Sequence, residues 1–470
     1  MLAYLILRRF FPGVWWFCYL AGALAIAHTA DRHFLWIGQL NQPGFIFWTL
    51  LACLLLVDSF RARRLRFALA LTVGACLAEV LSLYSYEAQL PLMILFPAFL
   101  IWLPQGRVKS RPALLSGWYV LILLYARETV LSYAKGEGSY QQSMLHENLS
   151  SWTYLKELFL LAKVSLSFWD WTSSSEVEAP LVGRLVLGMV GSLVVVAGLR
   201  FALGDTWTRW GEDRPGQLLA ALKAGAAGLV SSILVFAAMA SAESRYRVLM
   251  LPGIGASIFM AGLAGLAAIH GPKRLGRWPA FLAVAGVIGF GINFGIGHGA
   301  VHFSRWEYHR QTMATLLKAI PALRPGTLLV VANVPDLDPF HYSKYWFDFT
   351  VRLAYPLNRV AGVYVYHDGT TPPNLKLRLD DTRWEWTETC PPSFFTGASV
   401  ENSVIYEVNA DGGRVVDEIP AFFHASVEAQ RLYHPHERIL PQASPIARTR
   451  YYPERSSWTL LSVIRPAPAH

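Results

Sequence analysis

Long apolar runs dominate the first 300 residues of the chain, and a mixed pattern of apolar and polar positions follows them. A helix that crosses the hydrocarbon core of a bilayer needs about 20 predominantly apolar residues. The run at 88–103 contains Pro91 and Pro97, which membrane helices tolerate where neighbouring groups satisfy the freed carbonyls. The pattern predicts nine membrane helices, at roughly 12–29, 43–58, 67–86, 88–103, 113–132, 181–202, 217–240, 248–269 and 278–298.

The composition supports a membrane protein and excludes several other classes. Of the 470 residues, 54% are hydrophobic and only 16% are charged, whereas soluble proteins average about 25% charged residues. A disordered scaffold needs the reverse balance. Four cysteines in this length are too few for a disulfide-stapled secreted module. We therefore expect an α-helical polytopic membrane bundle with a further domain attached.

The net charge of +9 lies entirely in residues 1–300, because residues 301–470 hold equal numbers of basic and acidic residues. A nucleic-acid-binding protein places a basic face on its soluble part, so no nucleic-acid partner is expected. Most Lys and Arg residues of the first part lie in alternate loops, and only Arg32, Arg245 and Arg247 lie in the short loops opposite. Since basic residues are retained on the cytoplasmic side, the N-terminus is predicted to be inside and residues after about 300 outside.

Two further parts lie outside the predicted membrane helices. The loop at 133–180 is long and external, and positions 152–163 alternate aromatic and charged residues, as in a helix that lies on a membrane surface. This loop is either a cover over an external cavity or a connector packed on the bundle. Residues 301–470 are expected to form a soluble periplasmic domain of α/β or α+β type. A helix is predicted at 305–322 and strands at 327–331, 362–366, 404–408, 414–419 and 458–464.

Glycine and alanine are frequent in the last three predicted membrane helices. Gly291 and Gly295 form a pair of small residues four positions apart, a spacing that lets two membrane helices approach closely. The pair predicts tight helix packing at this place.

Ionisable residues at membrane depth are costly and mark candidate functional sites. Glu79, Ser82, Tyr86 and Glu87 share one helical face, because their offsets of three, four, seven and eight residues coincide on a helix. That face is predicted to point into a polar cavity that opens outward. The alternative is a buried hydrogen bond from Glu79 to a neighbouring helix.

Two other groups of charged residues lie near the same outer level. Arg127 and Glu128, in the predicted helix 113–132, are placed where they could pair with these carboxylates. Asp31 follows the first predicted helix, where a carboxylate is either a general base or a cap or turn residue.

The segment Glu243-Ser244-Arg245-Tyr246-Arg247 places two arginines on the outer side, against the general charge trend. A guanidinium group matches a phosphate bidentately, so a lipid-linked phosphate at the headgroup level is one partner for Arg245 and Arg247. The alternative is an ordinary ion pair with Glu243 or a contact with lipid headgroups.

No cofactor is assigned from the sequence, although two patterns leave a divalent metal ion open. Asp336 and Asp338 resemble the DxD metal motif of nucleotide-sugar enzymes, but their flanking prolines are typical of a turn. The three histidines His424, His434 and His436 lack the spacing of metal ligands on a helix.

Two segments resemble the GT-C superfamily of polytopic glycosyltransferases. Tyr84-Ser85-Tyr86-Glu87 precedes a proline-interrupted apolar helix, and Ser244-Arg245-Tyr246-Arg247-Val-Leu-Met-Leu-Pro is similar to the "RYLYLP" stretch of that group. The sequence from Ala27 to Gly38 resembles a degraded form of a further motif of the O-mannosyltransferases that carry tetratricopeptide repeats. The resemblance covers roughly Leu2 to Ala300.

The resemblance implies a polyprenyl-phosphate sugar as donor, transfer on the outer face, and a catalytic Asp or Glu in the first external loop. Here Met1–Arg9 resembles the end of the family's second membrane helix. By this resemblance, the sequence lacks counterparts of the family's first membrane helix and of the acidic loop that follows it. Of the acidic residues present, Asp31, Glu79 and Glu87 are the candidates for a base, and none is at the family's position. We expect a chain that is truncated or inactive as given.

Together these features predict a GT-C-like protein of the bacterial inner membrane, with a membrane domain at 1–300 and a periplasmic domain at 301–470. Its expected partners are a polyprenyl-phosphate sugar, membrane lipids and an unidentified glycan or protein acceptor, in assembly of the cell envelope. The alternative is a non-catalytic subunit that binds or assembles lipid-linked glycans. A transporter or flippase is disfavoured, because the intramembrane charges gather at the outer end instead of threading the whole bundle.

Overall fold

The computed structural model divides the chain into two compact units, Met1–Gly299 and Ala300–Ala469. The residues that it describes are 1–28, 41–85, 89–104, 111–134, 150–167, 181–203, 215–238, 250–270, 278–334, 344–355, 359–367, 369–371, 375–388, 397–409 and 412–441.

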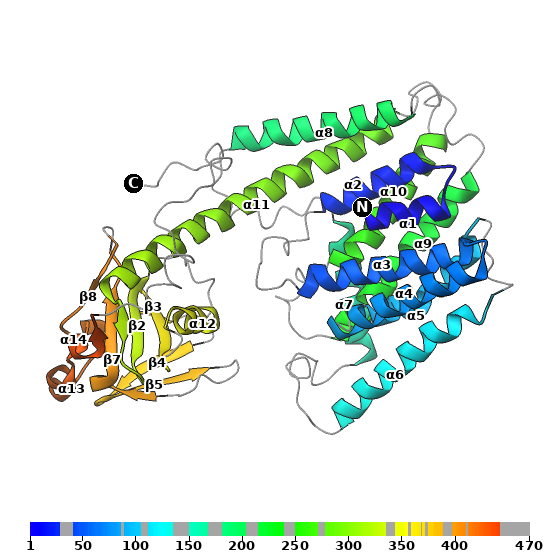
Figure 1. Ribbon diagram of the computed structural model, residues 1–470. Helices are drawn as coiled ribbons and strands as arrows, with labels where there is room; N and C mark the ends of the chain where they lie inside the picture. The colour runs from blue at the N-terminus through cyan, green and yellow to red at the C-terminus, as the bar shows by residue number, and fades with distance from the viewer. Residues whose placement is uncertain are drawn as a thin grey trace. The chain divides into compact units, whose positions relative to one another are not determined.

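The first unit is a bundle of helices (Figure 1). They are α1 (Leu2–Phe10), α2 (Trp15–Ile26), α3 (Asn41–Arg61), α4 (Leu65–Ser85), α5 (Leu90–Phe99), α6 (Leu114–Ala134), α7 (Ser151–Leu166), α8 (Leu181–Leu203), α9 (Pro215–Ile233), α10 (Met250–His270) and the first part of α11 (Trp278–Ala319). Short 3-10 helices lie at Leu100–Trp102 and Phe236–Ala238.

Five helices of the described chain are long and apolar enough to cross a membrane, where nine crossings were predicted. They contain the spans Gly44–Arg61, Leu65–Ser85, Leu114–Leu131, Pro215–Ala238 and Met250–His270. The other four predicted runs overlap apolar helical stretches that are shorter, at Trp15–Ile26, Leu90–Trp102, Gly188–Gly198 and Leu282–Ile296. Each of the nine apolar runs therefore corresponds to a described helical stretch, although α1 was not among them, and the number of crossings and their orientation stay predictions.

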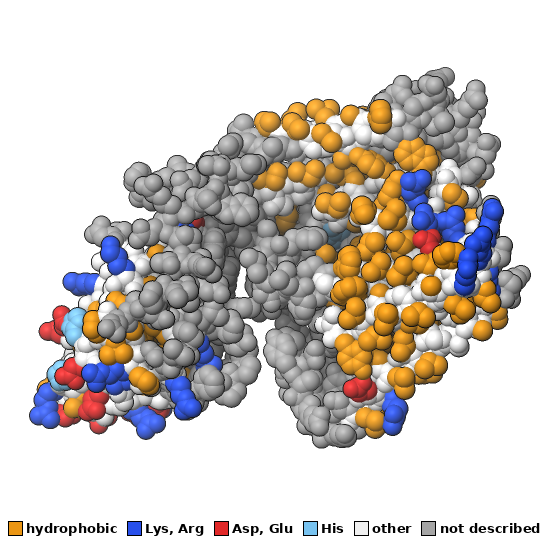
Figure 2. Space-filling view, viewed as in Figure 1, with side chains coloured by type: hydrophobic (Ala, Val, Ile, Leu, Met, Phe, Trp, Pro, Cys, Tyr) orange, Lys and Arg blue, Asp and Glu red, His pale blue; other side chains and the backbone are white. Residues whose placement is uncertain are grey.

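Large apolar side chains are exposed on the outside of the first unit (Figure 2). On α4 alone, Leu65, Val73 and Leu77 are each more than half exposed. An exposed apolar surface this extensive is costly in water and favourable in contact with lipid chains. The surface thus agrees with the apolar composition of these helices and indicates a protein embedded in a membrane.

The predicted surface helix at 152–163 is present as α7. Its N-terminus is capped by Ser150, whose hydroxyl accepts a hydrogen bond from the Thr153 amide at 3.1 Å. One face packs on the bundle, since Leu161 is buried and the Tyr154 hydroxyl donates to the Leu234 carbonyl at 2.8 Å. Whether the loop also covers a cavity stays a prediction.

A single helix of 42 residues, α11, stands where two separate helices were predicted at 278–298 and 305–322. No proline occurs between Ala280 and Ile320, and the glycines at 297 and 299 weaken a helix without breaking it. The change of composition near residue 300 marks the boundary between the two units, but it does not end the helix.

The second unit contains a four-stranded sheet in the order β3-β2-β7-β8. Strands β2 (Leu328–Val334), β3 (Ala361–Tyr366) and β7 (Ser403–Glu407) are parallel, and the short β8 (Arg414–Val415) is antiparallel to β7. A second, antiparallel sheet consists of β4 (Leu375–Asp380), β5 (Arg383–Glu388) and β6 (Gly397–Ser399). The remaining elements are α12 (Lys344–Ala354), α13 (Val427–Leu432), α14 (Pro435–Arg438), a 3-10 helix at Val400–Asn402, another at Ala421–Phe423, and the pair β1 (Ala322–Leu323) with β9 (Ile439–Leu440).

The parallel strands are buried on both faces, which is why they read as continuous apolar runs in the sequence. One face packs against Leu316 of α11 and Phe347 of α12, and the other against Trp384 of β5 and Tyr433. Burial raises the pKa of the Tyr433 hydroxyl, which accepts from the Ile405 amide at 2.8 Å and donates to the Val416 carbonyl at 3.1 Å. The unit is thus a three-layer structure of helices, sheet and smaller sheet.

Three of the five predicted strands are confirmed, as β2, β3 and β7. The strand predicted at 414–419 is reduced to the two residues of β8, and the strand at 458–464 lies outside the described residues. Strands β4 and β5 were not predicted, although Leu375–Asp380 alternates apolar and polar side chains as an amphipathic strand does.

Removing the Asp348 carboxylate is expected to destabilise the second unit by about 2 kcal/mol, because it leaves a buried donor unpaired. Asp348 on α12 accepts a hydrogen bond from the Gly362 amide of β3 at 2.8 Å and forms an ion pair with Arg352. Hydrogen exchange of the peptide at 361–366 should be faster in Asp348→Ala and close to normal in Asp348→Asn, whose amide oxygen still accepts. Equal protection in the Ala variant and the unmodified protein would contradict this role.

Candidate functional site

Glu79 is the buried acidic residue among the described membrane helices. It lies on α4 and has no exposed surface. Neither of its carboxylate oxygens has a hydrogen-bond partner within the described structure. Ser82, which was predicted on the same face, is equally buried, whereas Tyr86 and Glu87 lie outside the described residues, and the outward-opening polar cavity stays a prediction. The alternative of a hydrogen bond from Glu79 to a neighbouring helix is not seen in the part of the chain described.

Ser82 lies about one turn after Glu79 on α4 and is hydrogen-bonded to Thr49 and Gln89; we call Thr49, Glu79, Ser82 and Gln89 the polar cluster. The Thr49 and Ser82 hydroxyl oxygens are 2.7 Å apart and join α3 to α4. The Gln89 amide donates to the Ser82 carbonyl at 2.7 Å and to the Ser82 hydroxyl at 2.9 Å. All four residues are fully buried.

The polar cluster has a surplus of acceptors. The Gln89 carbonyl oxygen and both Glu79 oxygens are buried without a donor in the described structure. Buried polar atoms are almost always satisfied in native proteins, and each exception needs an explanation. Bound donors, such as hydroxyl groups or water molecules, would satisfy these oxygens.

The ends of several helices meet close to this cluster. Phe45 and Ile46 at the start of α3 pack against Leu251 at the start of α10 and Leu92 of α5. The Thr49 and Ser82 hydroxyls both hydrogen-bond the Phe45 carbonyl, at 2.8 and 3.3 Å. The polar cluster and the start of α10 therefore share the same neighbours.

The end of α2 reaches α10 through His28. Its Nε2 atom is 2.7 Å from the Ser165 carbonyl of α7, and its ring packs against Gly253 of α10. His28 is buried. The ends of α2, α7 and α10 are thereby held together by contacts within the described chain.

Most of the charged residues singled out in the sequence flank these helix ends. Asp31 lies three residues after His28, Glu87 lies two residues before Gln89, and Arg247 lies three residues before Met250. These three residues, together with Tyr86, Glu243 and Arg245, are outside the described residues. In the structure, the described helix ends that adjoin these residues in the sequence lie close together.

Arg127 and Glu128 do not join the polar cluster. Both side chains are exposed on α6, and Glu128 accepts a hydrogen bond from the Tyr84 hydroxyl at 2.5 Å. Tyr84 is 64% exposed, while Glu79, five positions earlier on the same helix, is fully buried. Five positions turn a helix by about 140°, so Tyr84 and Glu79 point to different sides of α4. The suggested pairing of Arg127 and Glu128 with Glu79 is not found among the described residues, because both side chains lie on the outer surface of α6, and Glu87 lies outside the described residues.

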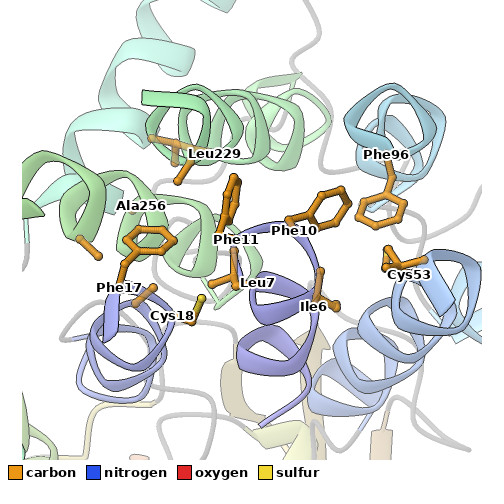
Figure 3. Packing of buried hydrophobic residues seen from close by; sticks show 14 of the residues in the cluster. Ile6, Leu7, Phe10, Phe11, Phe17, Cys18, Cys53, Phe96, Leu229 and Ala256 are labelled. Atoms are coloured by element: carbon orange, nitrogen blue, oxygen red, sulfur yellow. The ribbon is translucent and has the colours of Figure 1, made fainter. Parts of the chain in front are cut away.

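An apolar cavity of about 100 Å³ lies between α1, α3, α5, α9 and α10. Figure 3 shows part of its wall, where Phe10 of α1 faces Phe96 of α5 near Cys53 of α3. The wall is almost entirely hydrophobic, apart from Ser232 and the Cys53 thiol. Cys53 of the cavity wall lies on α3, which packs against α4, the helix that carries Glu79. The sequence did not reveal this cavity, since it depends on which helices pack together.

The described part of the chain does not support a metal site at the candidate residues. Within the described residues no group of three His, Cys, Asp or Glu side chains is placed to hold a metal ion. His436 contacts the Asp417 carboxylate at 2.8 Å, and His424 has a left-handed backbone conformation at the end of a 3-10 helix. Asp336 and Asp338 lie outside the described residues.

The chain is thus a mostly helical membrane-embedded protein with a sheet-containing C-terminal unit, and its helical bundle contains a buried carboxyl group and an apolar cavity. Comparison with protein-family models, with curated proteins and with solved structures found no match for it.

Proposed function

We propose that the protein takes a polyprenyl-phosphate-linked sugar as substrate and acts as a glycosyltransferase of GT-C type. It would do so in the bacterial inner membrane, with the second unit in the periplasm and a glycan or protein as acceptor. The observation that carries the proposal is the buried Glu79 carboxyl group, which has no hydrogen-bond partner among the described residues, in a helical bundle that also contains an apolar cavity.

The lipid, the sugar and the phosphate of a lipid-linked sugar each match a group of residues in this proposal. An aliphatic segment of the lipid is compatible with the hydrophobic cavity wall formed by α1, α5 and α10. A sugar offers hydroxyl donors, which the surplus acceptors Glu79 and Gln89 lack within the described structure. The phosphate needs cations, which Arg245 and Arg247 would supply from the segment before α10.

The reaction has two electrostatic requirements that these residues would meet. The acceptor hydroxyl must lose its proton as it attacks the anomeric carbon, and a carboxylate is a suitable base. The phosphate leaving group must be stabilised as its bond to the sugar breaks, and guanidinium groups do this. Glu79 is proposed as the base and Arg245 and Arg247 as the phosphate ligands, with Asp31 and Glu87 as the other candidates for the base.

The double variant Arg245→Ala/Arg247→Ala is expected to bind polyprenyl-phosphate sugars at least about tenfold more weakly, because charge-assisted hydrogen bonds to phosphate are lost. Binding of a panel of such donors to the purified full-length protein can be measured by native mass spectrometry. The variant Arg209→Ala/Arg214→Ala removes the same charge from another loop and serves as the matched control. Unchanged binding in the first variant would remove the phosphate assignment.

A second candidate function, a non-catalytic subunit that binds lipid-linked glycans, is favoured by the complete burial of Glu79. A base without exposed surface needs a conformational opening before it reaches an acceptor, whereas a binding site does not. Release of the polyprenyl phosphate separates the two. An enzyme converts the bound donor when an acceptor mixture is added, and a binding subunit returns it unchanged.

A further inference from the structure

A shallow pocket of about 660 Å³ lies at the opposite end of α4 from Glu79. Its walls come from α1, from the end of α3 and from the start of α4. They consist of Arg9, Asp58, Arg61, Arg63, Arg64 and Phe67, with Ala62 and Leu71 completing the lining. The pocket is separate from the proposed substrate site, since α4 is 21 residues, or roughly 30 Å, long.

The pocket is strongly cationic. Four guanidinium groups face a single carboxylate, which gives its lining a net charge of +3. Asp58 is already engaged by Arg9 through two bonds, from Nε at 2.8 Å and from a terminal nitrogen at 3.3 Å. Figure 2 shows the blue Lys and Arg side chains gathered at this edge of the first unit, with one acidic side chain beside them.

Hydrogen bonds and an ion pair connect the segments that carry these arginines to neighbouring parts of the bundle. Arg111 donates to the carbonyl oxygens of Ala62 and Arg63, at 2.9 and 3.0 Å, and so ties the turn between α3 and α4 to the segment before α6. The Arg9–Asp58 pair likewise ties α1 to the end of α3. Fixing the groups before a ligand arrives reduces the entropy lost on binding.

An apolar surface adjoins the charged one directly. Phe67, which is 55% exposed, and Leu71 form part of the pocket and continue into the exposed apolar side of α4. The Arg66 guanidinium lies 5.5 Å from the Phe67 ring centre. The pocket thus combines a site for phosphate oxygens with a site for hydrocarbon, within the length of two helical turns.

We infer that this pocket binds the headgroup of an anionic phospholipid, with the phosphate at Arg61, Arg63 and Arg64 and an acyl chain along Phe67 and Leu71. A guanidinium group recognises phosphate through bidentate hydrogen bonds, and basic pockets between membrane helices suit anionic headgroups. A soluble phosphate would leave the adjoining apolar surface unused, which favours a lipid. The inference goes beyond the proposed function and does not depend on it.

The double variant Arg61→Gln/Arg64→Gln tests the site. Binding of phosphatidylglycerol to the full-length protein, measured by native mass spectrometry, is expected to weaken roughly 30-fold, because each basic side chain near an anionic headgroup contributes about a factor of five. The control Arg274→Gln/Arg277→Gln removes the same charge from another basic segment and should leave binding unchanged. An equal loss in both variants would show only a general effect of positive charge and would overturn the site.

Two measurements on the unmodified protein test the lipid site without any variant. Phosphatidylglycerol should be retained in preference to phosphatidylcholine, and equal retention of the two would refute the inference. Glycerol phosphate, which has the headgroup chemistry without acyl chains, should bind far more weakly than phosphatidylglycerol. If it binds equally well, the occupant is a soluble phosphate ester and the lipid assignment is wrong.

Discussion

Replacing Glu79 with leucine is expected to stabilise the protein by about 2 kcal/mol and to abolish its proposed activity. The gain follows because a buried carboxyl group without partners costs free energy, which an apolar side chain of similar size does not. The loss follows because leucine cannot accept a proton. Thermal unfolding of the purified protein, monitored by tryptophan fluorescence, and turnover of a polyprenyl-phosphate sugar measure the two effects.

The isosteric variant Glu79→Gln is the matched control for this prediction. It keeps an uncharged polar group in the same position, so the stability gain should be absent, while transfer should still fall at least about 100-fold. A lower melting temperature in Glu79→Leu would show that the carboxyl group has a stabilising partner. Unchanged transfer in Glu79→Gln would exclude Glu79 as the base.

The variant Gly225→Ala is expected to destabilise the bundle by about 3 kcal/mol, because α9 and α10 are in backbone contact there. A methyl group at Gly225 would lie 2.5 Å from the Phe259 amide nitrogen and 2.9 Å from its Cα atom. The reverse contact exists at Gly255, where a methyl group would meet the Leu229 amide nitrogen. Backbone atoms cannot turn aside as a side chain can, so the two helices would have to separate. Thermal unfolding in detergent measures the loss.

Gly216→Ala, on the same helix, provides the comparison for Gly225→Ala. None of the described atoms lies within 4 Å of a methyl group at Gly216. Alanine also has a higher helix propensity than glycine, so this variant should be as stable as the unmodified protein or slightly more stable. Similar melting temperatures for the two variants would contradict close packing as the reason for Gly225.

The glycine pattern shows both what a sequence can predict about packing and what it cannot. Close approach was expected at Gly291 and Gly295. A methyl group at Gly291 would meet the Ala27 carbonyl of α2, but none of the described atoms lies within 4 Å of one at Gly295. A second close approach is at Gly289, where a methyl group would lie 2.7 Å from the Gly188 carbonyl oxygen of α8. Positions two apart differ by about 200° around a helix, so these glycines serve two different neighbours.

The helices and the parallel strands were predictable because their signal is local. An apolar run of about 20 residues or a short buried run specifies its own element. Strand β4 carries a signal as well, in the alternation of Leu375–Asp380, but β4 and β5 were not predicted. The length of α11 was not predicted, since the composition changes near residue 300 without ending the helix.

For the candidate site, the sequence identified Glu79 and the buried side of α4, since a charge in an apolar run stands out. It did not predict that Thr49 and Gln89 bond with Ser82, or that His28 bonds with the Ser165 carbonyl, because these contacts depend on which helices lie next to each other. Nor did it reveal that Glu128 bonds with Tyr84 on the outer surface. Ionisable residues can be recognised in the sequence, whereas the side chains that they contact are determined by the tertiary fold.

The Cys53 thiol can be used to measure whether the apolar cavity is occupied. Cys53 belongs to the wall of the apolar cavity and has almost no exposed surface, so water-soluble alkylating reagents should label it slowly. A small membrane-permeant maleimide that enters the cavity would modify it faster. A lipid chain in the cavity would then block that reaction, and mass spectrometry of the Cys53 peptide would follow occupancy without a substitution in the protein.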